Sequence, residues 1–519
     1  MERRKFLRNA ASTMAVPFLF QGQWLKAMAG PSVFELLNAY NSNRKLIMVQ
    51  LNGGNDGLNL LIPTSEYDNL AVQRANILLP KAQILKLTDE TGLHPSMPEI
   101  VSLYKDGKIQ IIQGVGYPNP NLSHFRSKDI LMSASDSNVN INSGWMGRLF
   151  TNHYPGYPIG YPNSTNPHPI ALTIGSTSSA ICQAESSNYS SVISSLSTTY
   201  SSTPAETTYP ATPFGNELKF ITNIMEQTGS YLSVIKEAAS KAKNLSALYP
   251  AAGQNSLADQ LKLVANLIGG GLQTQIYVVS LGGWDTHSAQ VASTDKSTGS
   301  QPALMSKLSK AIAAFQDDLR LLKKEDEVIG LVFTEFGRRI MSNDSLGTDH
   351  GTTWPAIVFG SKVNPAIIGS NPKISSVVDK TSNLPLQNDF RSIYAAVFKQ
   401  WFEIPQTETN QLLGKAFTEI PLIAGTTIGL VAENKPIANV KFWPNPVADT
   451  ASLSFEANGQ FTQIGIYSMS GQLIEHLYEE KFIEGKQLLL LHLGHLRRGV
   501  YLIVLIQNQQ RQSLKFVKI

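Results

Sequence analysis

The sequence predicts an α/β fold with a mainly parallel sheet sandwiched by helices, followed by a small C-terminal antiparallel β-sandwich. Three observations support this prediction. Apolar strand-like runs alternate with helical patterns across residues 44–430. Short alternating strands separated by turn signals fill residues 438–519. The 519 residues are enough chain for two or more domains, at roughly 100–200 residues each.

The first domain contains two kinds of repeating element. Short apolar runs that end in glycine or polar turn residues predict buried strands at 46–51, 109–113, 275–281, 328–334 and 356–359. Longer segments with apolar residues spaced at about 3.6 positions predict helices at 215–245, 256–268, 303–324 and 389–402. This alternation is typical of a parallel sheet that helices cover on both faces.

Residues 174–210 interrupt the alternation. They are rich in Ser and Thr and have little periodicity, which predicts a flexible excursion or a cap insertion rather than a separate domain. Cys182 is the one cysteine of the chain, which excludes an intrachain disulfide and a cysteine-based zinc cluster. We expect this thiol to be inert.

The N-terminal segment, residues 1–29, has the features of an export signal. Paired arginines at positions 3 and 4 precede the weakly apolar run Ala10–Phe20, and Ala27-Met28-Ala29 is a small-x-small pattern that a signal peptidase accepts. The paired arginines before Phe-Leu resemble a twin-arginine signal; an ordinary amphipathic helix is the alternative. The apolar run is too short to span a bilayer, so we expect no transmembrane anchor in the mature chain.

The charge distribution argues against a nucleic-acid partner. The chain carries 43 Lys and Arg against 39 Asp and Glu, a formal net charge of +4. Residues 1–29 alone hold five basic residues and one acidic residue, so the remainder is close to neutral. No basic nucleic-acid footprint is therefore predicted.

The C-terminal segment changes character after about residue 432. Strands such as 465–468 and 501–504 are separated by Ser-Gly, Glu-Gly and Arg-Gly turn signals, and roughly 80 residues of this kind suit a small β-sandwich. The segment also resembles the C-terminal sorting domain of type IX secretion cargo, on the stretches Trp443-Pro444-Asn445-Pro446, 467–472, Gly499-Val500-Tyr501 and Lys515-Phe516-Val517-Lys518. A carbohydrate-binding or purely structural sandwich is the alternative.

Polar side chains repeatedly follow the predicted strands of the α/β domain. In open α/β sheets, ligands bind at the carboxyl edge of the strands, where the loops converge. Loop residues at that edge indicate function more readily than core residues do. The candidates are Asp56, Ser123, Asp285, His287, Glu335 and His350.

Asp285, His287 and His350 are candidate metal ligands. In an extended turn, residues 285 and 287 face the same way, so a carboxylate and an imidazole can share one ion. His350 lies in Gly-Thr-Asp-His-Gly, and the flanking glycines let the backbone close around a ligand. Asp56 and Glu335 are candidates for a second divalent ion, although an Asp in an Asn-Asp-Gly turn is also ordinary turn chemistry.

Ser123 precedes the helical stretch 124–133 and is expected at its N-cap, where a hydroxyl and free backbone N–H groups face one anion-sized space. There a metal-activated Ser123 would be the nucleophile and Arg126 would bind the anion through two hydrogen bonds. A helix cap without catalysis is the alternative for Ser123. Arg338 and Arg339 are expected to be solvated on the surface.

Residues of about 44–425 resemble the domain of unknown function 1501 family, on the stretches 50–59, Leu93-His94-Pro95, 123–127, Gly144-Trp145-Met146-Gly147-Arg148, 283–287, 334–338 and Asp349-His350-Gly351. That family is commonly exported with a twin-arginine signal and is related in fold to the alkaline phosphatase superfamily. The superfamily pattern implies that Asp56 is a metal ligand and Ser123 the nucleophile.

The same pattern implies that Asp285, His287 and His350 are further ligands. Glu335-Phe336 stands where the pattern has Thr-x-Asp-His, so one ligand departs from it. His124, next to Ser123, is the candidate replacement, and Asp349 is a further candidate.

The sequence and the resemblance together predict an exported metal-dependent hydrolase of phosphate or sulfate esters. The expected cofactor is a divalent metal, with zinc as the first candidate. The expected partners are a small or polymer-borne ester and the export and type IX secretion machinery. The chain is expected in the periplasm in transit, and then at the cell surface or in the medium. A non-catalytic cell-surface binding protein with at most one structural metal is the alternative.

Overall fold

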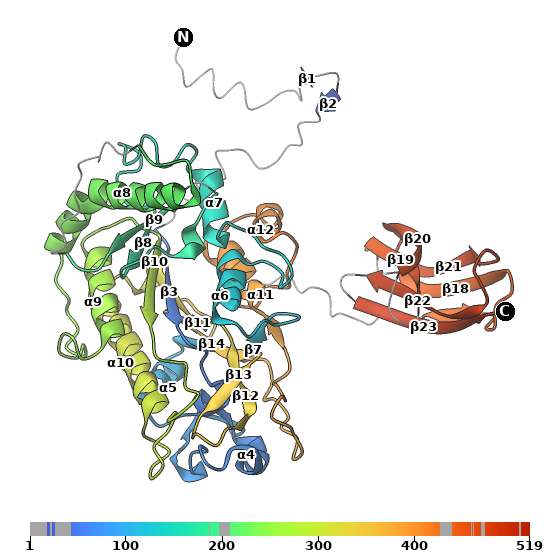
Figure 1. The fold of residues 1–519 in the computed structure, drawn as a ribbon, viewed down its shortest axis with the longest axis horizontal. Coiled ribbons are helices and arrows are strands. Elements are labelled where there is room, and N and C mark those ends of the chain that lie inside the picture. Colours follow the sequence, from blue (N-terminus) through green and yellow to red (C-terminus); the bar gives the residue numbers. More distant parts are fainter. Residues whose placement is uncertain are drawn as a thin grey trace. The chain divides into compact units, whose positions relative to one another are not determined.

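The computed structural model describes residues 43–185, 187–196, 208–425, 439–457, 459, 461–468, 473–507 and 510–519, with the backbone of two short N-terminal strands. The chain divides into two compact units, Met1–Thr426 and Thr427–Ile519 (Figure 1). The predicted signal 1–29 lies outside the described residues, except for the antiparallel strands β1 (Phe18–Phe20) and β2 (Gln23–Leu25). Within the described residues, no helix has both the length and the apolar character needed to cross a membrane.

A nine-stranded sheet forms the centre of the described part of the first unit, in the order β15-β7-β14-β11-β3-β10-β8-β9 with β16 beside β7. β14 runs antiparallel to both of its neighbours, whereas the other pairs are parallel. The predicted mainly parallel sheet is confirmed. Its strands are β3 (Lys45–Leu51), β7 (Ile109–Gly116), β8 (Ala171–Ile174), β9 (Ser190–Ile193), β10 (Ile276–Leu281), β11 (Val328–Thr334), β14 (Trp354–Phe359), β15 (Ile367–Ile368) and β16 (Asn388–Asp389).

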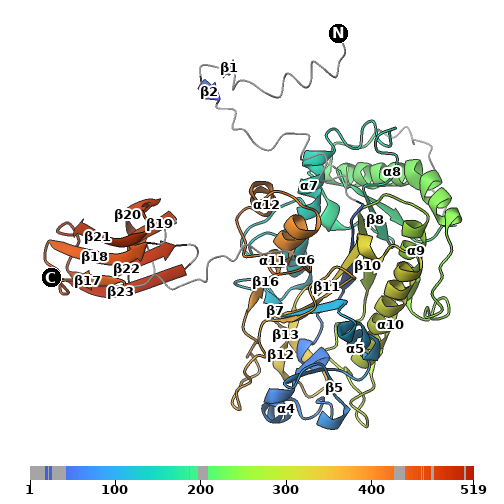
Figure 2. The same cartoon turned by 180° about the vertical axis from the view of Figure 1, so that it is seen from behind.

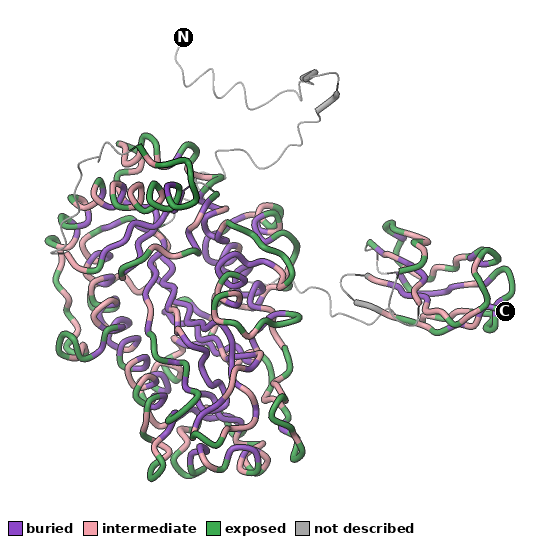
Figure 3. The backbone as a smooth tube through the Cα atoms, viewed as in Figure 1, coloured by how far each residue is buried: buried purple, intermediate pink, exposed green. Residues whose placement is uncertain are grey.

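Helices cover both faces of this sheet because its strands are apolar on both sides (Figures 1 and 2). Leu46 and Met48 of β3 pack in one core cluster, and Ile47 and Val49 pack in the other. Figure 3 shows the buried strands between the partly exposed helices. The first face carries α6 (His124–Ser133), α7 (Trp145–His153), α11 (Phe390–Ala396), the π-helical turn η5 (Val397–Trp401) and α12 (Gln406–Leu413). The second face carries α5 (Pro98–Lys105), α8 (Pro213–Lys241), α9 (Ser256–Gly269) and α10 (Ser300–Leu321).

The four predicted helices match α8, α9, α10 and the continuous pair α11–η5 to within a few residues. Capping side chains fix where two of them begin. Oγ1 of Thr212 accepts the backbone N–H of Gly215 at the start of α8, and Oδ1 of Asn255 accepts that of Ala258 at the start of α9. These bonds satisfy N–H groups that the first helical turn leaves without partners.

The Ser/Thr-rich segment contributes a strand to the sheet, which corrects its description as an insertion alone. Ser190–Ile193 form the edge strand β9 beside β8. The hydroxyls of Ser190 and Thr173 lie 2.7 Å apart, so polar side chains in this buried pair satisfy each other. Residues 186 and 197–207 lie outside the described residues. Cys182 is buried, and burial raises the pKa of its thiol, as expected for an inert group.

A hairpin, two short helices and a small three-stranded sheet lie beyond the carboxyl edge of the central sheet. The hairpin of β12 (Gly337–Ser342) and β13 (Thr348–Gly351) connects β11 to β14. Helices α3 (Gly57–Leu60) and α4 (Tyr67–Arg74) follow β3 and pack with a three-stranded sheet of β4 (Leu61–Pro63), β5 (Leu85–Lys86) and β6 (Thr91–Leu93).

The described part of the second unit consists of two antiparallel sheets, β17-β18-β21 and β20-β19-β22-β23. Apolar residues from both sheets, among them Leu453, Ile466 and Phe516, form a separate core. The strands are β17 (Lys441–Trp443), β18 (Thr450–Ala457), β19 (Phe461–Ser468), β20 (Leu473–Lys481), β21 (Gly485–His492), β22 (Gly499–Gln507) and β23 (Gln510–Lys518). The expected antiparallel strands are present.

Candidate metal centre

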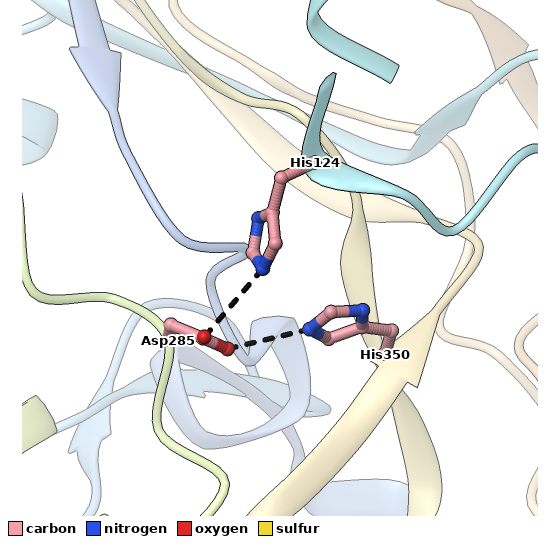
Figure 4. A group of neighbouring side chains, drawn as sticks. All are labelled: His124, Asp285 and His350. Atoms are coloured by element: carbon pink, nitrogen blue, oxygen red, sulfur yellow. Dashed lines mark hydrogen bonds and ion pairs between the residues drawn. The ribbon is translucent and has the colours of Figure 1, made fainter. Parts of the chain in front are cut away.

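Three segments at the carboxyl edge of the sheet bring together His124, Asp285 and His350 (Figure 4). His124 is the first residue of α6, Asp285 follows β10, and His350 lies on β13. Since β14 is reversed, its start lies at the same edge as the ends of β7 and β10, which is why the hairpin before β14 reaches this site. One ligand atom from each of the three side chains lies within 4.8 Å of the others.

The Asp285 carboxylate is the centre of this group. Its Oδ1 lies 3.3 Å from Nε2 of His350 and 3.3 Å from Nε2 of His287. Its Oδ2 lies 3.5 Å from Nε2 of His124. Tetrahedral zinc, with metal–ligand bonds near 2.0–2.1 Å, separates neighbouring ligand atoms by about 3.3 Å. The spacing of these donors therefore fits a small divalent ion.

Each imidazole is held through its Nδ1 by an oxygen acceptor. Nδ1 of His124 lies 3.0 Å from Oε1 of Glu335, and Nδ1 of His287 lies 3.1 Å from Oδ1 of Asp349. Nδ1 of His350 lies 2.9 Å from the carbonyl oxygen of Leu122. Because these oxygens accept hydrogen bonds, each Nδ1 is the donor of its pair, and each Nε2 is left facing the carboxylate of Asp285. Oxygen partners of this kind orient metal-binding histidines in proteins.

The Nε2 atoms of His287 and His350 lie only 2.9 Å apart. With both Nδ1 atoms protonated, two neutral rings would place their lone pairs against each other. A proton on one of the two Nε2 atoms, or a cation close to them, would relieve that repulsion. The arrangement is thus chemically suited to a cation.

Charges around the group keep Asp285 ionised and favour a neutral His350. Partial burial alone would raise the pKa of Asp285, but hydrogen bonds from Arg338 and His350 hold it below its usual value. Burial lowers the pKa of His350, and the charge of Arg338 lowers it further. A carboxylate and a neutral imidazole are the forms that bind metal ions.

The Asn-Gly-Gly turn after β3 supports Asp285 through its backbone. A Cβ on Gly53 would lie 2.2 Å from the backbone nitrogen of Asp285, so only glycine allows the two loops to approach. The carbonyl oxygen of Gly54 accepts Nε of Arg338 at 2.7 Å, and Nη2 of Arg338 donates to Oδ1 of Asp285 at 2.7 Å. Arg338 is buried, which corrects the expectation of a solvated arginine.

Asp56 does not join the group, which corrects its assignment as a ligand for a second ion. Its side chain is buried, and its Oδ2 pairs with Arg74 at 2.8 Å and accepts Nε2 of Gln290 at 2.8 Å. Its Oδ1 accepts the backbone N–H of Leu58 at the start of α3. Both oxygens are therefore used by the protein, and the turn alternative describes this residue better.

Glu335 also differs from its expected role as a direct ligand. It is buried behind His124, and its Oε1 accepts the backbone N–H of Gly53 at 2.8 Å as well as His124. Asp349 stands behind His287 in the same way. The two carboxylates orient histidines instead of facing Asp285. His124, named as the replacement ligand, is in the group.

Ser123 is the N-cap of α6, and its side chain makes no capping hydrogen bond. It lies between Leu122, whose carbonyl contacts His350, and His124. Arg126 is not an anion clamp in this structure. Its Nη2 donates to the carbonyl oxygens of Ser137 at 3.1 Å and Val139 at 2.7 Å, so it braces the loop after α6.

Sequence reasoning missed Arg74 and Gln290, which engage Asp56, because nothing in a single sequence links residues so far apart to one carboxylate. It also missed the contact of Phe336 with the histidines. The ring of Phe336 lies 4.3 Å from that of His350 and 4.9 Å from that of His124. Phe336 forms an apolar wall beside the group.

The fold and this site define an α/β protein with a candidate metal centre at the carboxyl edge of a mainly parallel sheet. The family model described as protein of unknown function (DUF1501) matches residues 43–414, so the chain belongs to this family. A model described as secretion system C-terminal sorting domain matches residues 441–519. The second match indicates export to the cell surface or the medium. No curated protein matches the chain in sequence.

Several solved structures are similar to this chain. One is a protein in the alkaline phosphatase superfamily from Vibrio parahaemolyticus, with 8% identity, 91% of this chain and 79% of that chain covered, and a TM-score of 0.32. Another is a phosphonate monoester hydrolase from Silicibacter pomeroyi, with 9% identity, 92% and 89% covered, and a TM-score of 0.31. A surface component of the type IX secretion system of Porphyromonas gingivalis has 17% identity, 16% and 11% covered, and a TM-score of 0.12. These values are too low to transfer an activity.

Proposed function

We propose that this exported protein is a hydrolase of phosphate or sulfate esters that depends on a divalent metal ion, with zinc as the first candidate. His124, Asp285 and His350 would hold the ion, with His287 beside them. One observation carries the proposal: three imidazoles are each fixed through Nδ1, and their Nε2 atoms face the carboxylate of Asp285.

A bound divalent ion would supply positive charge to the ester oxygens as negative charge develops on them. The residues of the chain would position the nucleophile and the ester. Ser123 stands next to His124 at the start of α6, where backbone N–H groups of the first turn favour an anion. Its hydroxyl would lose its proton to water, and Oγ would form a bond to phosphorus or sulfur as the bond to the leaving oxygen breaks and that oxygen takes up a proton. Water would then hydrolyse the seryl ester and return the proton to Oγ.

A non-catalytic binding protein with one metal ion is the second candidate. Two observations favour it. The carboxylates expected at a second ion, Asp56 and Glu335, are bound by Arg74 and by His124. Phe336 places an apolar ring directly beside His350. A two-metal reaction of the alkaline phosphatase kind therefore lacks support. Both candidate functions require a site for one metal ion.

The two candidates separate in one set of experiments on the purified chain loaded with zinc. We expect hydrolysis of at least one of p-nitrophenyl phosphate, bis(p-nitrophenyl) phosphate and p-nitrophenyl sulfate, with activity lost in Ser123→Ala and in His124→Ala. His492→Ala, an exposed histidine of β21, is the matched control and should be fully active. Zinc binding without turnover of any of the three esters would favour the binding protein. Full activity in Ser123→Ala would refute the nucleophile.

A further inference from the structure

The C-terminal unit contains a groove between β17 and β23. Its volume is about 500 Å³, and residues 440–443, Asn445, Leu514 and Lys515 line it. Trp443, Asn445 and Lys515 belong to the stretches on which this segment resembles a sorting domain, yet none of them is in the main core. Asn445 bonds to β23, whereas the exposed side chains of Trp443 and Lys515 are available to a ligand.

Part of the groove wall is the outer edge of β23. Among the described residues, β23 pairs along its length with β22 alone. The edge is closed near the C-terminus, because Asn445 binds the carbonyl oxygen of Lys515 at 3.0 Å and the N–H of Val517 at 2.9 Å. Val447 also pairs with Val517 and Ile519 there.

The same edge is open toward Ser513. In an antiparallel strand every second residue directs its N–H and C=O to one side, so residues 513, 515 and 517 share the outer edge. Within the described part of the chain, no group bonds the backbone N–H or C=O of Ser513 on that side. An open strand edge is a template for one more strand.

The side chains of the groove define what that strand should contain. Lys441 and Lys515 are both exposed, and no acidic residue is among those that line the groove. The exposed indole of Trp443, with 44% of its surface accessible, adds an apolar contact. The groove is therefore complementary to an extended chain that carries acidic and apolar side chains.

We propose that this groove docks an extended acidic polypeptide segment of the export machinery, which adds as a strand to the open edge of β23. Backbone hydrogen bonds to Ser513 hold the segment, the two lysines select acidic side chains, and Trp443 packs against an apolar one. The match to a secretion sorting domain identifies the machinery as the partner. The groove and its chemistry identify the surface.

Export of the full chain in a bacterium with a type IX system tests the surface. Lys441→Glu with Lys515→Glu should lower the exported fraction at least tenfold and leave the chain in the periplasm. Lys481→Glu with Lys486→Glu, an equal charge change on β20 and β21, should be exported normally. Ser513→Pro removes one outward N–H without any change of charge, and an edge strand tolerates proline. It should lower export as well, with an unchanged melting temperature.

A binding measurement tests the chemistry. Fluorescence anisotropy with the purified full chain should detect a labelled hexapeptide of alternating Glu and Val, at least tenfold tighter than one of alternating Lys and Val. The Lys441→Glu, Lys515→Glu chain should lose that preference. Normal export of both groove variants, or equal affinity for the two peptides, would overturn the proposal. Sedimentation gives a further test. If the wild-type chain is a dimer and the lysine variant is a monomer, the groove docks a second copy and the proposal is overturned. None of these readouts involves ester hydrolysis.

Discussion

Oε1 of Glu335 lies 3.0 Å from Nδ1 of His124, and this contact decides which nitrogen of His124 faces Asp285. The carboxylate is buried and is also fixed by the backbone of Gly53. If His124 binds a metal ion, Glu335 would influence that ion through His124, as carboxylates behind metal-binding histidines commonly do.

We expect Glu335→Gln to weaken zinc binding by about tenfold or more, because an amide orients the imidazole less strongly than a carboxylate does. Competition with a chromogenic chelator measures this affinity. Glu327→Gln is the control, since Glu327 pairs with Lys45 and Lys324 at the other end of β11. An unchanged affinity in Glu335→Gln would show that this contact does not serve the metal.

The purified chain should bind one zinc ion, and His124→Ala or Asp285→Ala should abolish stoichiometric binding. His287→Ala should weaken binding less than these two, because His287 lies outside the group of three whose ligand atoms all lie close together. Elemental analysis after dialysis gives the stoichiometry. Two tightly bound ions per chain would contradict the one-ion site.

Asp56→Ala should destabilise the protein by about 3–5 kcal/mol, because it leaves the buried charge of Arg74 without its partner. The same variant should keep its zinc, since Asp56 is outside the group around Asp285. Denaturant unfolding gives the first quantity and elemental analysis the second. Asp68→Ala, an exposed residue of α4, is the control and should change stability by less than about 0.5 kcal/mol. Loss of zinc in a folded Asp56→Ala chain would restore Asp56 as a ligand.

His94 should make the stability of the first unit depend on pH. Burial lowers its pKa from 6.5 to about 4, and its Nδ1 accepts the backbone N–H of Ser96. Between these two values the unfolded chain binds more protons than the folded chain, so the free energy of unfolding falls as the pH drops from 6.5 to 4. The loss is on the order of 3 kcal/mol at full protonation.

Unfolding by denaturant at a series of pH values measures this slope. His94→Gln removes the titrating ring and should flatten the curve between pH 6.5 and 4, whereas His492→Gln should leave it unchanged. An equally steep curve in His94→Gln would assign the slope to other groups.

The sequence was sufficient for the main central strands and the longest helices of the first domain. Runs such as 46–51 and 328–334 are short, mostly apolar and end in turn signals, which favours buried strands, and the spacing in 256–268 favours a helix with one apolar face. Ser190–Ile193 escaped this reasoning because serine side chains have no apolar period. The hydroxyl of Ser190 is buried against that of Thr173 at 2.7 Å, a contact that only the tertiary structure provides.

The sequence also placed Asp285, His287 and His350 at one edge, because the carboxyl ends of parallel strands meet there. Which carboxylates face that edge depended on tertiary structure. Asp56 is bound by Arg74 of α4, and Glu335 by the backbone of Gly53 and by His124. A strand or helix is set by short-range periodicity, which a single chain displays. The partner of a charged side chain depends on which distant residues pack beside it in the folded protein. A local sequence pattern does not contain that information.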